Sequence, residues 1–233
     1  MASRKDRPPL PAGPYVVVGL ARSGQAAARL LAGRGEEVIG TDSGNPDGAK
    51  RLRDAGVEVH LDGDLEELAD DAGCIVKSPG VPREAPLVRR ALTLGVPVIG
   101  ELELAWRLLP NRFVAVTGTN GKTTVTELLG HVWRAAGEPV AVAGNVGTPL
   151  AALVDEVDEG TTIVCECSSF QLEDATDFAP ECAALLNITP DHLDRHGTFE
   201  DYVAAKLRIF ARQSHADTAV IDRSDPTLAG LEL

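Results

Sequence analysis

A glycine-rich turn between an apolar strand pattern and a helical pattern has the clearest chemical potential in this 233-residue chain. Residues 113–124 read FVAVTGTNGKTT. Backbone N–H groups of such a turn can wrap phosphates, Lys122 can reach the outer phosphates, and the Thr123 hydroxyl can ligate Mg²⁺. The loop is shorter than the strict Walker pattern, which would require a glycine where Val116 stands. The alternative is a glycine-rich turn between strand and helix that binds no ligand. We predict ATP or GTP binding by Gly118, Thr119, Asn120, Gly121, Lys122, Thr123 and Thr124.

A second glycine-containing turn follows the first predicted strand. Residues 18–24 read VGLARSG, which is similar to the dinucleotide-binding fingerprint except that Ala21 replaces the middle glycine. Asp42 ends the next strand, where an acidic residue would hold a ribose. The pattern leaves three alternatives open: NAD, another nucleotide such as a nucleotide-sugar diphosphate, or no ligand.

Polar side chains also stand at the ends of later apolar segments. Glu166 lies within a strand pattern, where a carboxylate is costly unless it is paired or bound to a metal. It is therefore a candidate Mg²⁺ ligand, and the alternative is a solvent-facing edge position. His192 stands in a loop with two carboxylates and is either a ligand or a plain capping or surface residue. Lys206 lies in the middle of a helical pattern and reads as a solvated lysine.

Short β-branched segments alternate with longer helical patterns, which is typical of parallel α/β sheets that are covered on both faces. A boundary near residue 110 divides the chain into two α/β domains. Strands are predicted over residues 15–20, 38–41, 57–60, 74–77, 96–99, 113–117, 140–143, 162–167, 183–188 and 218–221. Helices are predicted over residues 25–33, 86–94, 101–108, 123–136, 149–155 and 199–213.

Composition argues against several classes of protein. The chain has 22 Lys+Arg against 35 Asp+Glu, a net charge of −13, and this argues against nucleic acid as a partner. No apolar segment is long enough to span a bilayer, and residues 1–10 lack the apolar core of a signal peptide. Four cysteines without a CxxC pair suggest buried, reduced thiols. We expect a cytoplasmic protein with no membrane insertion.

Together these motifs resemble the Mur ligases of peptidoglycan synthesis, and most closely the branch that adds D-glutamate. The resemblance runs from about Tyr15 to the end of the chain. It rests on TGTNGKTT at 117–124, AGNVG at 143–147, ECSSFQLE at 166–173, DHLDR at 191–195 and YVAAKLRI at 202–209. The SPG loop at 78–80 and GELE at 100–103 also fit this branch.

The resemblance implies a Rossmann-like UDP-sugar domain over residues 1–109 and a P-loop-type ATP-binding domain over residues 110–233. It also implies two Mg²⁺ sites, one held by Thr123 and Glu166 and one by His192 and Lys206, with the lysine carbamylated. Lys122, Glu166, His192 and Lys206 would be the catalytic residues. The substrate would contact Leu20, Arg22, Ser23, Gly24, Ser43, Ser78, Pro79, Gly80, Asn145, Ser168, Gln171 and His192.

The implied reaction joins D-glutamate to UDP-N-acetylmuramoyl-L-alanine through an acyl phosphate formed from ATP, in a monomeric enzyme. Family members have a third, D-glutamate-binding domain, so we expect a truncated chain that is inactive alone. Alternatives are another Mur-type or folylpolyglutamate-type ligase, an NAD-dependent oxidoreductase, and a non-catalytic nucleotide-binding remnant. The oxidoreductase leaves Lys122 and its neighbours unexplained.

Overall fold

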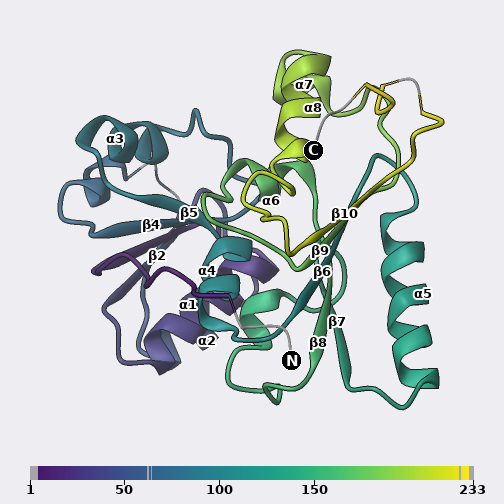
Figure 1. The fold of residues 1–233 in the computed structure, drawn as a ribbon. Coiled ribbons are helices and arrows are strands. Elements are labelled where there is room, and N and C mark those ends of the chain that lie inside the picture. The colour runs from purple at the N-terminus through teal and green to yellow at the C-terminus, as the bar shows by residue number, and fades with distance from the viewer. Residues whose placement is uncertain (1–4, 62, 64, 226, 231–233) are drawn as a thin grey trace. The chain divides into compact units, whose positions relative to one another are not determined.

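The fold is seen in a computed structural model, which describes residues 5–61, 63, 65–225 and 227–230 (Figure 1). Two predictions concern residues outside the described ones. Residues 1–4 belong to the segment that we expect to carry no signal peptide, and residues 226 and 231–233 lie near the end of the chain, where we expect a truncation. Within the described ranges, no helix is both long and apolar enough to cross a bilayer. The chain is α/β, as predicted, with two five-stranded sheets in which every strand pair is parallel.

The first sheet has the strand order β3-β2-β1-β4-β5. Its strands alternate in sequence with helices, because a parallel connection needs a crossover. Val17 and Val76 pack into a core on one face, while Val16 and Ile75 pack into a core on the other. The strands are β1 (Tyr15–Val18), β2 (Val38–Asp42), β3 (Glu58–Leu61), β4 (Cys74–Lys77) and β5 (Val98–Gly100). The helices are α1 (Arg22–Gly33), α2 (Ala49–Asp54), η1 (Glu66–Ala69), α3 (Pro86–Leu94) and α4 (Glu101–Leu108).

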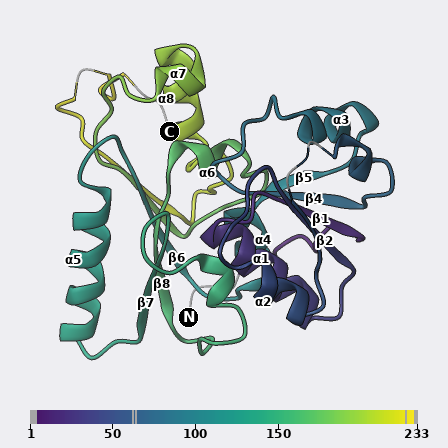
Figure 2. The same ribbon diagram turned by 180° about the vertical axis from the view of Figure 1, so that it is seen from behind.

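The second sheet has the strand order β10-β9-β6-β8-β7. Figures 1 and 2 show α5 running along this sheet, where it contacts β6, β7 and β8. Cys165 and Cys167 lie on the same side of the β8 segment with sulfurs 3.5 Å apart, as alternation predicts. The strands are β6 (Phe113–Thr117), β7 (Val140–Gly144), β8 (Thr162–Glu166), β9 (Cys182–Leu185) and β10 (Thr218–Ile221). The helical segments that follow β6 in the sequence are α5 (Lys122–Ala135), η2 (Leu150–Ala152), α6 (Ser169–Glu173), α7 (Leu193–His196) and α8 (Phe199–Leu207).

The order of the second sheet brings the predicted functional segments together. β6 lies between β8 and β9, and the chain crosses from one side of β6 to the other between these two strands. In open parallel sheets, ligands bind at the carboxyl ends of the strands where the strand order reverses. The carboxyl ends of β6, β8 and β9 therefore meet at one place, where Lys122 begins the helix after β6, Glu166 ends β8 and His192 follows β9.

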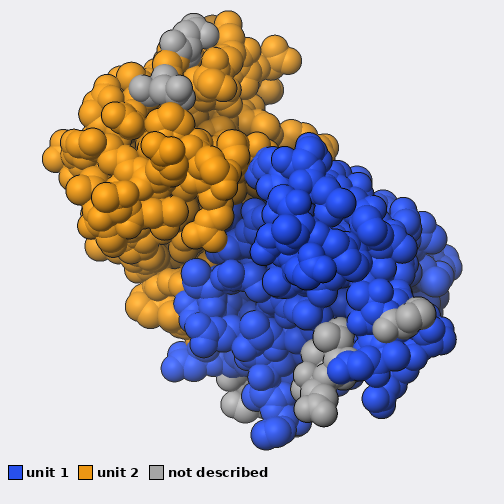
Figure 3. Space-filling view, turned by 90° about the horizontal axis from the view of Figure 1, so that it is seen from above, with its two compact units in different colours: residues 1–6, 109–148, 155–233 blue, residues 7–108, 149–154 orange. Residues whose placement is uncertain are grey.

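The chain divides into two compact units, coloured in Figure 3. Residues 7–108 and 149–154 form the unit that we call the first, because it carries the first sheet; it is unit 2, in orange, in Figure 3. Residues 1–6, 109–148 and 155–233 form the second unit, which is unit 1, in blue, in the same figure. The helix predicted over residues 149–155 is wrong, because this segment forms only the short 3₁₀ turn η2. Asp155, with a φ of 65°, has a left-handed conformation that a continuing helix does not allow.

Glu101 holds η2 within the first unit. The residue is 1% exposed, and its Oε1 accepts a 2.6 Å hydrogen bond from the backbone N–H of Ala151. Oε2 is buried without a hydrogen-bond partner. Burial raises the pKa of Glu101 from 4.5 to about 7, although the backbone amides of Ala151 and Leu150 act in the opposite direction.

We predict that Glu101→Gln removes a pH dependence of stability. The folded state holds the Glu101 proton more tightly than the unfolded state, so wild-type stability is full below pH 4.5 and falls as the pH rises towards and through 7. A shift of this size corresponds to about 3 kcal/mol, while the amide of the variant cannot ionise. Urea unfolding of both proteins at pH 5 and pH 8 measures the difference. An equal difference between the two proteins at both pH values would contradict the prediction.

Gly144 lets β7 end against the backbone of β8. A Cβ atom at this position would lie 2.2 Å from the carbonyl oxygen of Glu166, and φ is +121°, which L-residues rarely adopt. Gly147, three residues on, also has a positive φ of 78°, but a Cβ atom added there would meet nothing within 4 Å. Asn145 follows Gly144 directly, so this close approach to β8 fixes the position of the Asn145 backbone.

We therefore expect Gly144→Ala to be much more harmful than Gly147→Ala. The first substitution adds a backbone clash to left-handed strain and should cost more than about 3 kcal/mol, whereas strain alone at Gly147 should cost about 1 kcal/mol. Thermal unfolding of the two variants measures the difference. Equal losses would show that the contact with Glu166 does not constrain this turn.

Candidate functional site

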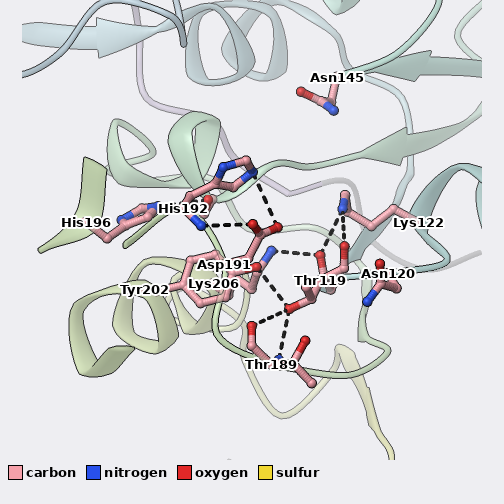
Figure 4. Close-up of polar contacts among 12 residues, drawn as sticks. Thr119, Asn120, Lys122, Asn145, Thr189, Asp191, His192, His196, Tyr202 and Lys206 are labelled. Atoms are coloured by element: carbon pink, nitrogen blue, oxygen red, sulfur yellow. Dashed lines mark hydrogen bonds and ion pairs between the residues drawn. The ribbon is translucent and has the colours of Figure 1, made fainter. Parts of the chain in front are cut away.

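Residues 118–124, which we call the phosphate loop, have the backbone conformation that the glycines predict. Gly118 and Gly121 have φ values of 154° and 82°, and Gly121 is the residue before α5. Gly121 provides no side-chain cap, so the first N–H groups of α5 are not covered by a capping side chain. Lys122 folds over the loop and donates to the carbonyl oxygens of Gly118 at 3.0 Å and Thr119 at 2.9 Å (Figure 4). The loop thus presents a cation and backbone donors at a helix N-terminus, which suits phosphate.

The segment after β9, together with Tyr202 of α8, forms hydrogen bonds that hold the same loop in place. The N–H of Thr119 donates to the carbonyl of Asn187 at 3.0 Å, and the N–H of Asn120 donates to Asn187 Oδ1 at 2.9 Å. Thr119 Oγ1 accepts from the N–H of Thr189 at 3.0 Å and lies 3.0 Å from the hydroxyl of Tyr202. Asn187, Thr189 and Tyr202 are absent from the predicted site residues. Their contacts with the loop join residues that are 67 to 83 positions apart, and no spacing rule in the sequence relates them.

Glu166 ends the buried strand β8 and is 3% exposed. The alternative of a solvent-facing edge is wrong, because β8 lies between β6 and β7. Thr123 Oγ1 donates to Glu166 Oε2 at 2.7 Å, and Asn145 Nδ2 donates to Glu166 Oε1 at 2.9 Å. Both carboxylate oxygens therefore have partners from different elements, α5 and the turn after β7.

The Thr123–Glu166 pair fits a magnesium site. Mg²⁺ prefers oxygen ligands, and neighbouring ligands of an octahedral ion lie about 3 Å apart. The hydroxyl and carboxylate oxygens are 2.7 Å apart, close to that spacing. Thr123 is exposed, so an ion could reach the pair from the side of the phosphate loop.

Lys206 is buried, and the sequence-based expectation of a solvated lysine is wrong. It is 2% exposed, and Nζ donates to the carbonyl of Gly118 at 2.8 Å. Nζ also lies 4.8 Å from the centre of the Tyr202 ring. Burial, with the nearby charge of Lys122, lowers the pKa of Lys206 from 10.5 to about 8. The α8 helix thus aims an unusually acidic ammonium group at the phosphate loop.

His192 lies at the start of α7 with a left-handed φ of 51°. Its ring is 51% exposed, with Nε2 3.5 Å from Asp191 Oδ2 and the ring centre 5.0 Å from that of Phe170. Across the described ranges, no three His, Cys, Asp or Glu side chains are grouped closely enough to hold a metal ion. A site at His192 would therefore need a ligand of another kind.

Two predicted substrate contacts, Ser168 and Gln171, form a capping box at the start of α6. Ser168 Oγ accepts from the N–H of Gln171 at 3.2 Å, while Gln171 Oε1 accepts from the N–H of Ser168 at 3.0 Å. Gln171 is 2% exposed. This gives both residues a structural role, because they stabilise the turn that follows Glu166.

In the other unit, the turn after β1 is closely packed. A Cβ atom on Gly24 would lie 1.9 Å from the carbonyl oxygen of Gly19, so only glycine fits. Ser78 Oγ donates to that same carbonyl at 2.6 Å, and the side chain of Leu20 is fully buried. Asp42 accepts from the N–H groups of Leu20 and Gly44. Of the residues predicted to contact substrate here, the exposed ones are Arg22, Ser43 and Gly80, while Ser23 and Pro79 are half-buried.

Comparison with known families matches both parts of the chain. Residues 14–100 match the N-terminal domain of MurD-like Mur ligases, and residues 116–232 match the Mur ligase middle domain. The chain is 46% identical over 221 residues to the UDP-N-acetylmuramoylalanine--D-glutamate ligase of Pelotomaculum thermopropionicum. It is 47% identical over 220 residues to the ligase of that name from Geobacter metallireducens. Both alignments cover 93% of this chain and 49% of the relative, so the chain spans about half the length of these relatives.

Solved structures share the fold at lower identity. A UDP-N-acetylmuramate:L-alanyl-gamma-D-glutamyl-meso-diaminopimelate ligase from Neisseria meningitides matches with a TM-score of 0.61 and 20% identity, over 92% of this chain and 72% of that one. The UDP-N-acetylmuramate-alanine ligase MurC of Thermotoga maritima matches with a TM-score of 0.52 and 23% identity, over 91% and 50%. The two domain matches, in this order and covering nearly the whole chain, show that the chain belongs to the Mur ligase family.

Proposed function

We propose that this chain is the nucleotide-binding part of an ATP-dependent ligase that joins D-glutamate to UDP-N-acetylmuramoyl-L-alanine in peptidoglycan synthesis. The observation that carries the proposal is the Thr123–Glu166 pair, 2.7 Å apart beside a glycine-rich loop at a helix N-terminus. The names and 41–47% identity of the curated relatives support this choice of substrate. A cytoplasmic, monomeric enzyme is part of the same proposal.

The chain's own residues suit a phosphoryl transfer followed by an acyl transfer. Lys122 and the first N–H groups of α5 would hold the ATP phosphates, while Thr123 and Glu166 would hold Mg²⁺, which neutralises phosphate charge when bound. A substrate carboxylate oxygen would attack the γ-phosphorus and release ADP, giving an acyl phosphate. The amine of D-glutamate would then attack the acyl carbon, lose a proton and expel phosphate. Positioning supplies most of the phosphoryl-transfer catalysis.

The first unit would hold the UDP part of the substrate. We assign this role to the turn of residues 20–24, Ser43 and the loop of residues 78–80, because the N–H groups at the start of α1 have no side-chain cap. Asn145, Ser168, Gln171 and His192 would position the rest of the substrate. Asp42 already binds two backbone N–H groups, so the ribose role that an NAD site needs would compete with those bonds.

Calorimetric titration tests the nucleotide site. Wild-type protein should bind Mg·ADP, and Lys122→Ala should weaken binding 10- to 100-fold, since a charge-assisted contact with phosphate contributes about 1.5–3 kcal/mol. Lys50→Ala is the matched control, because Lys50 is an exposed lysine on α2 in the other unit. Equal binding by wild type and Lys122→Ala would exclude the phosphate loop as the nucleotide site.

Parallel titrations of the same protein distinguish the remaining alternatives. UDP-N-acetylmuramoyl-L-alanine should bind, and NADH and a folate should not. Binding of NADH alone would favour an oxidoreductase, and binding of the folate alone would favour a folylpolyglutamate-type ligase. Nucleotide binding without binding of the UDP-sugar would favour a non-catalytic nucleotide-binding module.

We also propose that Lys206 is carbamylated and, with His192, holds a second Mg²⁺. An ammonium group cannot ligate a metal, whereas a carbamate offers two oxygens. The lowered pKa of Lys206, about 8, supports the modification, because a neutral amine can attack CO₂. The new N–C bond forms as the nitrogen loses a proton, and the product is an anion beside Gly118.

A carbon-13 experiment tests the modification. In ¹³C-bicarbonate at pH 8.5, where more than half of the Lys206 amine is neutral, the protein should show one carbamate signal near the usual carbamate shift. At pH 6.5 the amine is almost fully protonated, so the signal should weaken strongly. Lys206→Met should remove the signal, and Lys50→Ala should retain it. A signal that persists in Lys206→Met would belong to another amine.

A further inference from the structure

His196 is the one histidine near the site, among the described residues, whose ring is almost fully enclosed. Its side chain is 1% exposed, and its two ring nitrogens contact two different residues of α6. Nδ1 lies 2.9 Å from Glu173 Oε1, and Nε2 lies 3.0 Å from Ser169 Oγ. We propose that His196 is a positioning residue that fastens α7 to α6 and, through Phe170, orients His192. The role of His192 rests on the proposed function.

The hydrogen-bond partners favour one tautomer of His196. A carboxylate only accepts, so Glu173 requires the ring proton on Nδ1. Nε2 then accepts from the Ser169 hydroxyl, which can rotate to donate. Burial lowers the pKa of His196, so the neutral ring is favoured. Because both nitrogens are occupied, His196 is not available as a metal ligand, in contrast to the half-exposed His192.

The ring of His196 also supports Phe170. The two rings are stacked, with centres 5.2 Å apart and planes inclined by 6°. Phe170 in turn contacts the ring of His192 at 5.0 Å and lies 4.6 Å from the guanidinium carbon of Arg195. The rings of His196 and Tyr202 meet edge to face with their centres 5.2 Å apart, so α8 contributes to the same cluster. A continuous series of ring contacts thus leads from the buried His196 to His192.

α7 needs such contacts because it is too short to be stable as a helix on its own. It has only four residues, far fewer than an isolated helix requires. His192 precedes it in the left-handed region, at a φ of 51°, and such strain persists only where the surroundings hold it. His196 lies at the other end of the same short helix and is its one buried residue.

Ring-proton NMR of His192 tests the proposal without any metal or nucleotide. Wild-type His192 should be shifted by the ring current of Phe170, and His196→Ala should return this signal towards that of an unstructured histidine by several tenths of a ppm. His196→Phe should rescue part of the shift, because it retains the stacking but loses both hydrogen bonds. His131→Ala, at an exposed position on α5, is the control and should leave the signal unchanged.

If His196→Ala does not fold, Ser169→Ala serves in its place, since it removes only the contact with Nε2 and should give a smaller shift in the same direction. A folded variant with an unmoved His192 signal would overturn the proposal. Mn²⁺ titration then links the cluster to function, and affinity should fall about tenfold in His196→Ala, as for other residues that support ligands. A moved His192 signal with unchanged Mn²⁺ affinity would retain the positioning role and reject the metal role of His192.

Discussion

The buried carboxylate of Glu166 is the constraint on which the second unit depends. A carboxylate on a strand that lies between two other strands is stable only if its oxygens have hydrogen-bond partners. Thr123 and Asn145 supply these two hydrogen bonds to Glu166. Those partners must arrive from α5 and from the end of β7. The close approach of Gly144 to the Glu166 backbone and the placement of α5 behind a glycine loop both follow from this requirement. The geometry of the candidate site and the folding stability of this unit therefore depend on the same contacts.

Much of the fold could be predicted because its signals are local. β4, β6, β10 and α3 have the predicted bounds, since β-branched segments and a helix that starts at a proline and ends at a glycine are read directly from neighbouring residues. The phosphate loop is predictable for the same reason. Short helices such as α6 and α7 are not, because four or five residues show no periodicity and owe their structure to tertiary contacts.

The surroundings of the site could not be predicted, because they depend on contacts between distant segments. Lys206 resembles any exposed helical lysine in sequence, and only the packing of α8 against the phosphate loop buries it. His196 and Phe170 are separated by 26 residues, and no spacing rule relates them. The side chains that could contact a ligand are recognisable by type, whereas those that support them are not, because their residue types are common in any core.

The inclusion of residues 149–154 in the first unit has a consequence for how this protein can be divided. A cut at the linker near Leu109 would separate the sheet of β1–β5 from a strip of chain that completes its packing. Leu150 and Ala151 are buried in this chain, and they would be lost from an N-terminal piece expressed on its own. The two units are therefore interleaved along the sequence, and a gene fragment that ends near Leu109 encodes an incomplete first unit.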